Sequence, residues 1–277
     1  MNTAKVVAEA GCNHGGNIET AKRMIAIAAQ CGVDVVKFQK RDPNSFANMT
    51  YRHPNPRHSY GNTYGEHRAA LEFDQEQHAK LLKCCLENGV GYSCSVWDCA
   101  SATVISDIGA SMIKIPSARN HREDIFGLLL SKCDIDIHVS LGMADSDERC
   151  EILRRGELDT RHKWVYYHCT SSYPCAYEDV ALDEIPYLRA AAAITASIGW
   201  SSHTRGIAIE PAAYAMGAEW IEKHFTLDRE AKGTDQANSS EPKEMRRLVE
   251  NLRHVYEARG YKNKLSAPEW EQRRKLR

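Results

Sequence analysis

Eight short runs rich in β-branched and aromatic residues alternate with amphipathic helical patterns along almost the whole chain. Strand–helix units repeated in this way are typical of a parallel sheet. Eight units fit a closed barrel better than an open doubly wound sheet, and 277 residues suit an architecture that usually takes roughly 250. We therefore predict a single-domain (β/α)8 TIM barrel. Strands are expected at 5–11, 33–39, 91–96, 111–117, 135–142, 163–170, 196–203 and 219–227, and helices at 18–31, 75–88, 98–108, 122–132, 145–155, 181–193, 206–217 and 242–258.

The barrel is predicted to span residues 1–258, with one long excursion at 40–74. This segment is polar, rich in Pro, Asn, Tyr and His, and follows the second strand. It is expected to lie over the barrel mouth as a binding loop or lid, because loops of this length are usually functional. Residues 259–277 form a charged tail that contains Pro268, expected as a frayed end or a helical extension.

Composition narrows the classes of partner. The formal net charge of -1 favours neither nucleic acid nor an anionic membrane surface. The N-terminus has no basic region followed by an apolar core, and no apolar run approaches ~18 residues, so a cytoplasmic location is expected. The ten cysteines show no CxxC pair and no zinc-like spacing, which predicts reduced, mostly buried thiols.

Nearly every predicted strand ends in polar or ionisable residues. In a barrel of this kind the C-terminal strand ends face one common pocket, so these side chains are expected to meet there. The alternative is that these polar residues simply lie in solvent-exposed loops, which would account for one or two of the strand ends. It accounts poorly for Lys37 and Lys114, because both lysines lie inside apolar strands. With Ser95, Ser117, Ser140 and the backbone at Gly142, the two lysines form a lining suited to a phosphate or carboxylate. A Schiff-base lysine is the rival interpretation.

Two histidines are candidates for a metal site. His203 ends the seventh predicted strand and His224 lies in the eighth, so neighbouring strands bring both to one rim. Two imidazoles with open positions suit a divalent metal that acts as a Lewis acid, although a histidine in a core is more often simply hydrogen-bonded. Glu9 in the first strand adjoins the eighth across the barrel closure, where a carboxylate could act as a general base toward water.

In their order along the chain, several segments resemble the sialic acid synthase family. They are AEAGCNHGG, VDVVKFQ, TYGEHRAALEF, KIPSA, VSLGMA, HCTSSYPCAYEDVAL, IGWSSHTRGIAI and WIEKHFTLDREAKGTDQANSSEP, and the resemblance covers roughly residues 5–258. It implies an enzyme that adds phosphoenolpyruvate (PEP) to an open-chain sugar aldehyde, typically N-acetylmannosamine or its 6-phosphate. The products would be a 2-keto-3-deoxy sugar acid and inorganic phosphate.

The resemblance also implies roles for individual residues. His203 and His224 match the metal ligands, with Mn²⁺ expected first and Co²⁺ or Mg²⁺ as alternatives, and Glu9 matches a glutamate that holds the attacking water. The positions that match the PEP-binding lining are Lys37, Ser95, Lys114, Ser117, Thr170, Ser171 and Ser202. The positions that match sugar-facing residues are Gln39, Tyr173 and Asp235.

The chain departs from the family pattern in three ways. It is expected to lack the antifreeze-like domain that usually follows the barrel and reaches into the partner subunit, so a homo-oligomer, as a dimer, would have to use barrel surfaces, the 40–74 loop or the tail. Second, Arg119 stands where an acidic residue is usual. Third, Gln236 stands where many members have histidine, and Arg205 adds another cation after His203. Arg119 and Arg205 are therefore expected to contact the sugar, with an arginine fork that recognises an acidic group on the aldehyde.

Two other functions remain open at this point. A metal-dependent aldolase or lyase on the same barrel would use pyruvate, and only the synthase would release phosphate from PEP. A non-catalytic sugar-acid binding protein would be expected to have lost its metal or base residues. Glu9, His203 and His224 are all present, which argues against it.

Overall fold

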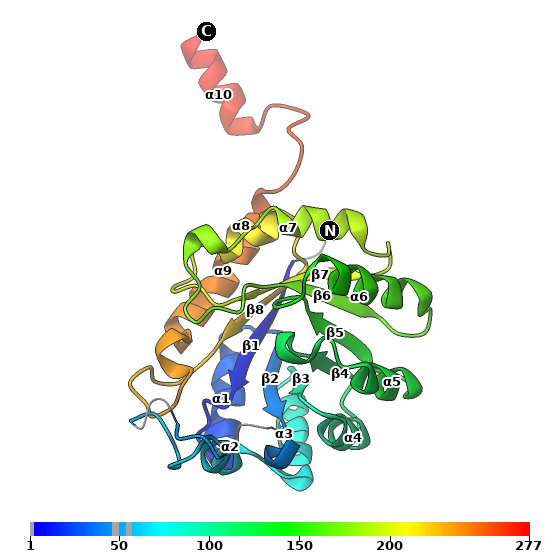
Figure 1. Ribbon diagram of the computed structural model, residues 1–277. Coiled ribbons are helices and arrows are strands. Elements are labelled where there is room, and N and C mark those ends of the chain that lie inside the picture. The colour runs from blue at the N-terminus through cyan, green and yellow to red at the C-terminus, as the bar shows by residue number, and fades with distance from the viewer. Residues whose placement is uncertain (1–2, 46–49, 54–56) are drawn as a thin grey trace.

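The computed structural model describes residues 3–45, 50–53 and 57–277, and its eight parallel strands close into a barrel (Figure 1), which confirms the predicted fold. Neighbouring strands pair in chain order, and β1 also pairs with β8. The strands are β1 (Lys5–Gly11), β2 (Val35–Lys40), β3 (Gly91–Val96), β4 (Met112–Ile115), β5 (Asp136–Ser140), β6 (Trp164–His168), β7 (Ser197–Ser202) and β8 (Trp220–His224).

The eight predicted helices are all present, and they alternate with the strands along the chain as expected. They are α1 (Ile18–Gln30), α3 (Gln75–Glu87), α4 (Cys99–Asp107), α5 (Glu123–Ser131), α6 (Ser146–Leu158), α7 (Glu184–Ala191), α8 (Glu210–Ala215) and α9 (Pro242–Ala258). Strands β4 to β8 end one to three residues before their predicted ends, because the polar residues there leave the strand ladder and form the loops of the pocket.

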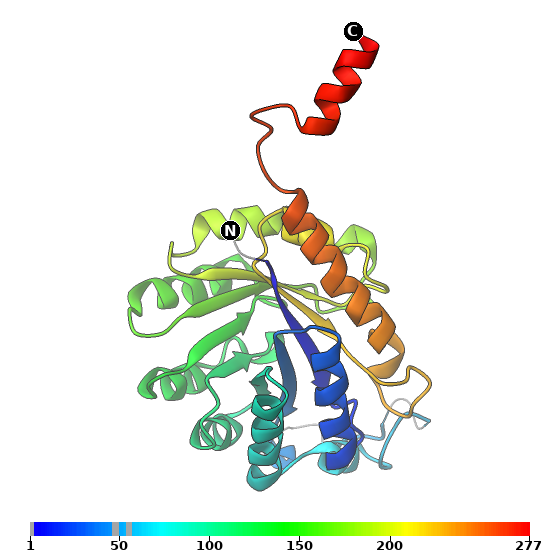
Figure 2. The same ribbon diagram turned by 180° about the vertical axis from the view of Figure 1, so that it is seen from behind.

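Two further helices were not predicted as separate elements. Helix α2 (Tyr64–Leu71) lies within the 40–74 segment and begins with a capping box between Thr63 and Glu66. Helix α10 (Ala267–Leu276) lies in the tail, has no buried residue, and projects from the barrel in both Figure 1 and Figure 2.

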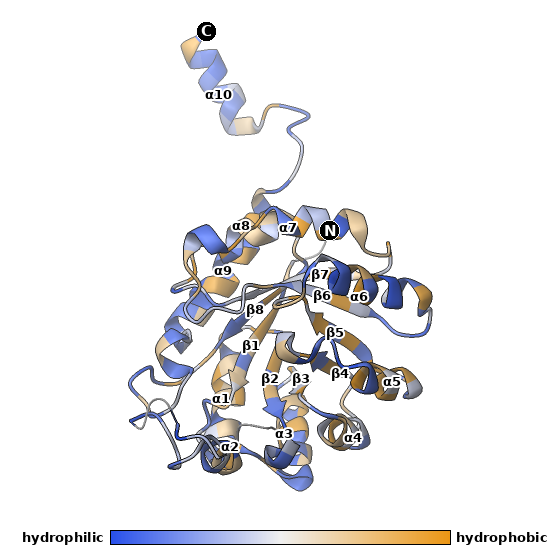
Figure 3. Cartoon of the chain, in the orientation of Figure 1, coloured by the Kyte–Doolittle hydropathy of each residue, from blue (hydrophilic) through white to orange (hydrophobic). Residues whose placement is uncertain are grey.

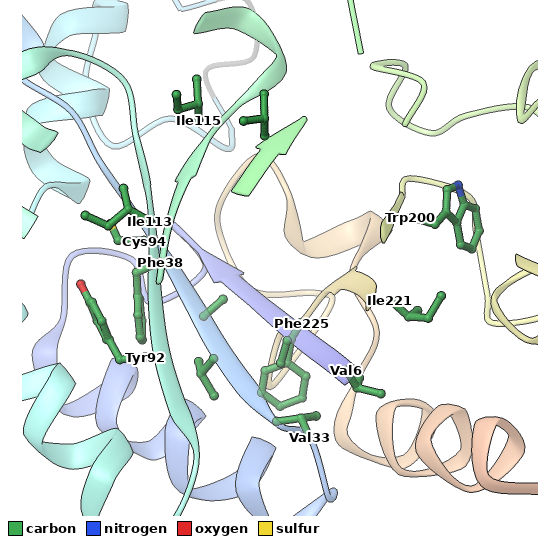
Figure 4. Close-up of a cluster of buried hydrophobic side chains, with 14 of the residues drawn as sticks. Val6, Val33, Phe38, Tyr92, Cys94, Ile113, Ile115, Trp200, Ile221 and Phe225 are labelled. Carbon is green, nitrogen blue, oxygen red and sulfur yellow. The ribbon is translucent and has the colours of Figure 1, made fainter. Parts of the chain in front are cut away.

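Side-chain alternation along the strands separates two environments. In β2, Val36 and Phe38 are fully buried and point outward to the helices, while Lys37 and Gln39 point into the barrel. Phe38 lies 6.0 Å from the ring of Tyr92 in the apolar layer (Figure 4). Figure 3 shows mainly hydrophobic colours on the strands and largely hydrophilic colours on α9 and α10. Packing of the outward-facing side chains against the helices therefore stabilises the strands, and the inward-facing side chains can be polar.

The described residues of the 40–74 segment lie at the end of the barrel toward which the strands run (Figure 2). There the hydroxyl of Tyr60 donates a hydrogen bond of 2.7 Å to the carbonyl of Lys232 in the loop after β8. Residues 46–49 and 54–56 of this predicted loop lie outside the described residues. The described part forms one wall of the cavity at this end.

Candidate active site

A cavity of about 630 Å³ opens at the C-terminal ends of the strands. Its size suits a small-molecule site. The predicted site residues that line it are Glu9, Lys37, Gln39, Ser95, Lys114, Ser117, Ser171, Tyr173, His203, His224 and Asp235. The structure therefore brings eleven of the predicted residues together around one space.

The floor of the cavity holds a chain of buried polar contacts that begins at Glu9. Its Oε2 lies 2.5 Å from Lys37 Nζ, and its Oε1 accepts a hydrogen bond of 2.8 Å from Gln39 Nε2. Lys37 Nζ also donates to Ser95 Oγ at 2.7 Å. Because Glu9 pairs in register with Lys37 on one side and with His224 on the other, it joins the lysine end of the site to the imidazole end.

Glu222 in β8 is a central residue of this floor that the sequence analysis missed. It lies 2.7 Å from Lys114 Nζ and 3.5 Å from Lys37 Nζ, and it accepts a hydrogen bond of 3.0 Å from Ser201 Oγ. The signal that could have found it is the period of two along the strand: Glu222 shares the face of His224.

The charges of the floor support one another. Burial lowers the pKa of Lys37, but the carboxylates of Glu222 and Glu9 outweigh it and raise that pKa overall. Burial would raise the pKa of Glu222, but Lys114 and Lys37 hold it well below its usual range. Burial lowers the pKa of Lys114, and Glu222 opposes this only in part. The floor is thus an array of alternating charges rather than a simple cationic patch.

Hydroxyl groups surround the space above the lysines. Ser171 Oγ is buried and has no hydrogen-bond partner among the described residues, and Ser117 Oγ lies 3.3 Å from Cys169 Sγ. A Cβ atom at Gly142 would lie only 2.6 Å from Ser171 Oγ and 2.7 Å from Ser117 Oγ. The absence of a side chain at this glycine therefore keeps the serine hydroxyls accessible to an anion.

His203 and His224 lie together beside the floor, with ring centroids 5.8 Å apart. His203 Nδ1 donates to the carbonyl of Thr170 at 2.8 Å, which leaves Nε2 free to act as a ligand. Burial lowers the pKa of His203 to about 3, with a further contribution from His224, so the imidazole is neutral near pH 7. Tyr173 covers the pair, with its ring 4.1 Å from that of His203.

The two imidazoles fit a divalent metal. The Nδ1 atom of His224 is buried and has no hydrogen-bond partner in the described structure, as expected for a nitrogen that coordinates a metal. Within residues 3–45, 50–53 and 57–277, no three His, Cys, Asp or Glu side chains form a metal-binding group. Water or substrate oxygens would therefore complete the coordination of any metal here, which matches an open Lewis-acid site.

Four predicted site residues are not among those lining the cavity. Thr170 Oγ1 donates to the carbonyl of Asp179 at 2.7 Å, and Ser202 Oγ, on the outer face of β7, accepts from Lys223 Nζ at 3.0 Å. Of the two consecutive serines Ser201 and Ser202, Ser201 is the one that lines the cavity. Arg205 is exposed, and the half-buried Arg119 has its guanidinium 6.0 Å from the ring of Trp97. The sequence could not assign the two faces of β7 near its end, and it could not say which way the loop arginines turn.

The mouth of the cavity contains residues that the sequence analysis did not select. They are Arg41, His53, His58, Tyr64, Arg68 and Trp97, of which five lie in or beside the 40–74 segment. The helical spacing of Tyr64 and Arg68 would have placed both on one face, but only once α2 is known to be a helix.

The chain is similar to known proteins over most of its length. The sequence model of the NeuB family matches residues 24–264. N-acetylneuraminate-9-phosphate synthase of Drosophila melanogaster is 35% identical over 253 residues, covering 90% of this chain and 67% of that protein. N,N'-diacetyllegionaminic acid synthase of Campylobacter jejuni is 32% identical over 270 residues, covering 94% and 78%.

A solved structure extends the comparison to three dimensions. The N-acetylneuraminic acid synthetase from Leptospira borgpetersenii superposes with a TM-score of 0.83 at 27% identity, covering 99% of this chain and 91% of that one. In the part of the chain that is described, no helix has both the length and the apolar character needed to cross a membrane.

Proposed function

The chain belongs to the NeuB family, and we propose that it condenses PEP with an open-chain sugar aldehyde to give a 2-keto-3-deoxy sugar acid and inorganic phosphate. Relatives named as N-acetylneuraminate-9-phosphate and N,N'-diacetyllegionaminic acid synthases support this reaction class. The observation that carries the proposal is the register of Glu9, which lies between Lys37 and His224 in one cavity.

The lysine end of the cavity suits PEP, which bears a phosphate and a carboxylate. Lys37 and Lys114 supply positive charge, and the hydroxyls of Ser95, Ser117 and Ser171 supply hydrogen-bond donors. Each lysine is already held by a buried carboxylate, so the ammonium groups are fixed in place before the anion arrives. Preorganised donors of this kind lose little free energy to rearrangement when substrate binds.

The imidazole end suits the aldehyde. A divalent metal held by His203 and His224, proposed as Mn²⁺, would supply Lewis-acid polarisation of the aldehyde oxygen. Gln39, Tyr173 and Asp235 line the same part of the cavity and are proposed to contact the sugar. Holding both substrates in one pocket makes their encounter effectively unimolecular.

The carbon chemistry then follows from the placement of Glu9. C3 of PEP attacks the aldehyde carbon, which forms the new C–C bond and leaves positive charge at C2. The π bond of the aldehyde breaks, and its oxygen takes up a proton to become the new hydroxyl. Glu9 accepts a proton from a water molecule that adds to C2. The resulting tetrahedral intermediate expels phosphate by cleavage of the C–O bond, and the 2-keto group forms.

A pyruvate aldolase is the competing function on this barrel. A Schiff-base mechanism needs a lysine that is readily neutral, but the pKa of Lys37 is raised by Glu222 and Glu9. The pKa of Lys114 is lowered by burial, yet its amine is engaged by Glu222 at 2.7 Å. Neither lysine is therefore presented as a free nucleophile.

The test is a phosphate-release assay with PEP, Mn²⁺ and a panel of aldoses, run in water enriched in ¹⁸O. We expect phosphate in equal amount to the keto acid, without ¹⁸O in the phosphate, because the C–O bond breaks. Condensation with pyruvate, or label in the phosphate, would show that the proposed reaction is wrong.

The oligomeric state and the cellular location of the protein remain predictions. A homo-oligomer, proposed as a dimer, would be detected by light scattering at micromolar concentration, and a monomer would contradict it. The cytoplasmic location is likewise proposed from the sequence alone.

A further inference from the structure

Lys223 is a buried lysine on the outer, apolar face of β8. The residues on either side of it, Glu222 and His224, line the cavity, so Lys223 points toward the helix layer. Its neighbours on the outer face are Ile221 and Phe225, which are fully buried (Figure 4). Lys223 itself is only 1% exposed. A buried ammonium group costs free energy unless other polar groups hold it, so the partners of this lysine indicate what it does.

Three oxygen atoms surround the ammonium group of Lys223. Glu210 Oε1, at the start of α8, lies 2.8 Å from Nζ, and this glutamate is fully buried. Nζ donates hydrogen bonds to Ser202 Oγ at 3.0 Å and to the carbonyl of Thr204 at 2.6 Å. The hydroxyls of Ser202 and Thr204 also lie 3.0 Å apart. An ammonium group has three N–H donors, so three oxygen partners match its capacity.

Two of these partners flank His203, which is proposed as a metal ligand. The pairing of β7 with β8 ends at Ser202 and Lys223, so the ladder of the sheet does not extend to His203. The ammonium group contacts the residue before this histidine and the residue after it. Lys223 therefore fixes the chain on both sides of His203, at the point where strand pairing no longer does.

Lys223 also directly precedes His224 in β8. On the other side of His224, Phe225 N donates a hydrogen bond of 2.8 Å to the carbonyl of Glu9. One side chain thus connects the backbone segments that carry the two imidazoles, whose ring centroids lie 5.8 Å apart. Two histidines that share a metal need a fixed separation and direction, and residues outside the ligand set commonly provide both.

The alternative is that Lys223 and Glu210 only fix α8 on the barrel. That task needs the contact between these two residues alone. The other two partners, Ser202 and Thr204, belong to the end of β7 and the loop that follows it. Since both lie next to His203 in the chain, the arrangement favours a role in placing this histidine.

We propose that Lys223 is a positioning residue, anchored by Glu210, that fixes residues 202–204 so that the Nε2 atom of His203 faces the metal site shared with His224. The inference rests on the proposed function, in which the two imidazoles hold the divalent metal. Lys223 acts through the histidines, because it does not itself line the cavity. Loss of a residue that orients a metal ligand typically weakens metal affinity by roughly 10–100-fold.

The test is a calorimetric titration of the full chain with Mn²⁺ in the absence of substrates. Lys223→Met keeps the apolar stem and removes the ammonium group, and Glu210→Gln in the same chain avoids a buried carboxylate without a partner. We expect this double variant to bind Mn²⁺ roughly 10-fold or more weakly than the wild type. A separate titration with PEP should give a Kd within about twofold of the wild type, because PEP is proposed to bind at the distant lysine end.

Ser202→Ala is a milder variant that decides if the double variant does not fold. It removes one of the three partners of Lys223 and leaves the ion pair with Glu210 in place. It should weaken Mn²⁺ binding by about 2- to 10-fold, the range for one lost hydrogen bond, and leave the affinity for PEP unchanged.

Ile198→Ala is the matched control for a general loss of stability. Ile198 is fully buried on the same face of β7 as Ser202, and it is not a partner of Lys223. Urea unfolding should show that this variant is destabilised, while its Mn²⁺ affinity stays within about twofold of the wild type. Equal weakening of Mn²⁺ binding in the control, or unchanged Mn²⁺ affinity in the double variant, would overturn the inference.

The same titrations separate this inference from the reaction itself. Mn²⁺ binding that weakens in the double variant but not in the control, in a protein that releases no phosphate from PEP with any aldose, would uphold the positioning role and reject the proposed function. A wild type that releases phosphate, with a double variant that binds Mn²⁺ normally, would reject the positioning role alone. A wild type that binds no Mn²⁺ would also overturn the inference.

Discussion

Glu9 and Lys37 form an ion pair of 2.5 Å on adjacent strands, and both side chains are almost completely buried. The pair links two tasks that a condensing enzyme must combine, because Lys37 faces the proposed PEP site while Glu9 pairs in register with His224. Since Lys37 also contacts Glu222, the loss of Glu9 would not leave the lysine without a carboxylate. The role of Glu9 can therefore be tested without unpairing a buried charge.

Glu9→Gln should slow the chemical step by roughly 10²–10⁴-fold, the range for loss of a general base. The amide keeps the size of the side chain and can still contact Gln39, so the barrel should fold and bind PEP. The measurement is single-turnover phosphate release at saturating substrates. Unchanged turnover would remove Glu9 from the mechanism.

His203→Ala and His224→Ala should each abolish turnover and weaken Mn²⁺ binding without unfolding the barrel. The physical reason is that His203 and His224 are the adjacent pair of imidazoles proposed to hold the metal, so the loss of either leaves one ligand of the pair. Calorimetric titration with Mn²⁺ measures binding independently of activity. His254→Ala, which removes an exposed imidazole on α9, is the control. Near-normal Mn²⁺ affinity in both site variants would show that the metal assignment is wrong.

Glu222→Gln should destabilise the protein at pH 7 by about 3–5 kcal/mol, because it removes a buried partner of Lys114 and Lys37. The pKa of Glu222 is lowered in the folded state, so its contribution to stability is present above its ordinary value of 4.5 and is lost as pH falls below that value. The difference between wild type and variant in urea unfolding should therefore be constant from pH 7 to about pH 5 and shrink as the pH falls below 4.5. A difference that grows toward low pH would contradict the assigned charge.

Ser201→Ala and Ser202→Ala form a matched pair that tests the face of β7. Ser201 lines the cavity and contacts Glu222, whereas Ser202 contacts Lys223 on the outer face. We expect Ser201→Ala to lower kcat/KM for PEP by roughly 10-fold, the effect of one lost hydrogen bond. Ser202→Ala should change thermal stability but leave the KM for PEP unaltered. The reverse pattern would restore Ser202 to the PEP site.

Gly142→Ala should raise the KM for PEP by about 10-fold or more. The added Cβ would lie 2.6 Å from Ser171 Oγ and 2.7 Å from Ser117 Oγ, so the hydroxyls must move from the positions where they face the cavity. The KM for the aldehyde should change much less, because it is proposed to bind at the imidazole end. An equal rise for both substrates would indicate a general distortion of the pocket.

The sequence by itself determined the barrel and most of its site. Strand–helix alternation is a local property, and in a closed parallel barrel the strand ends must meet, so Glu9, Lys37, Lys114, His203 and His224 could be placed in one cavity in advance. Period-two alternation would also have indicated Glu222, which shares the inward face with His224.

Only the tertiary structure decided which side of the barrel wall each residue at the strand ends faces. Ser201 and Ser202 are neighbours with identical side chains, and the pairing of Ser201 with Glu222, which also lines the cavity, shows that Ser201 points inward. The same holds at the mouth, where Arg41 and Arg68 line the cavity and Arg119 and Arg205 do not. The guanidinium of Arg41 is oriented by packing on Trp97, which is distant in the sequence, and no local pattern in the sequence contains that information.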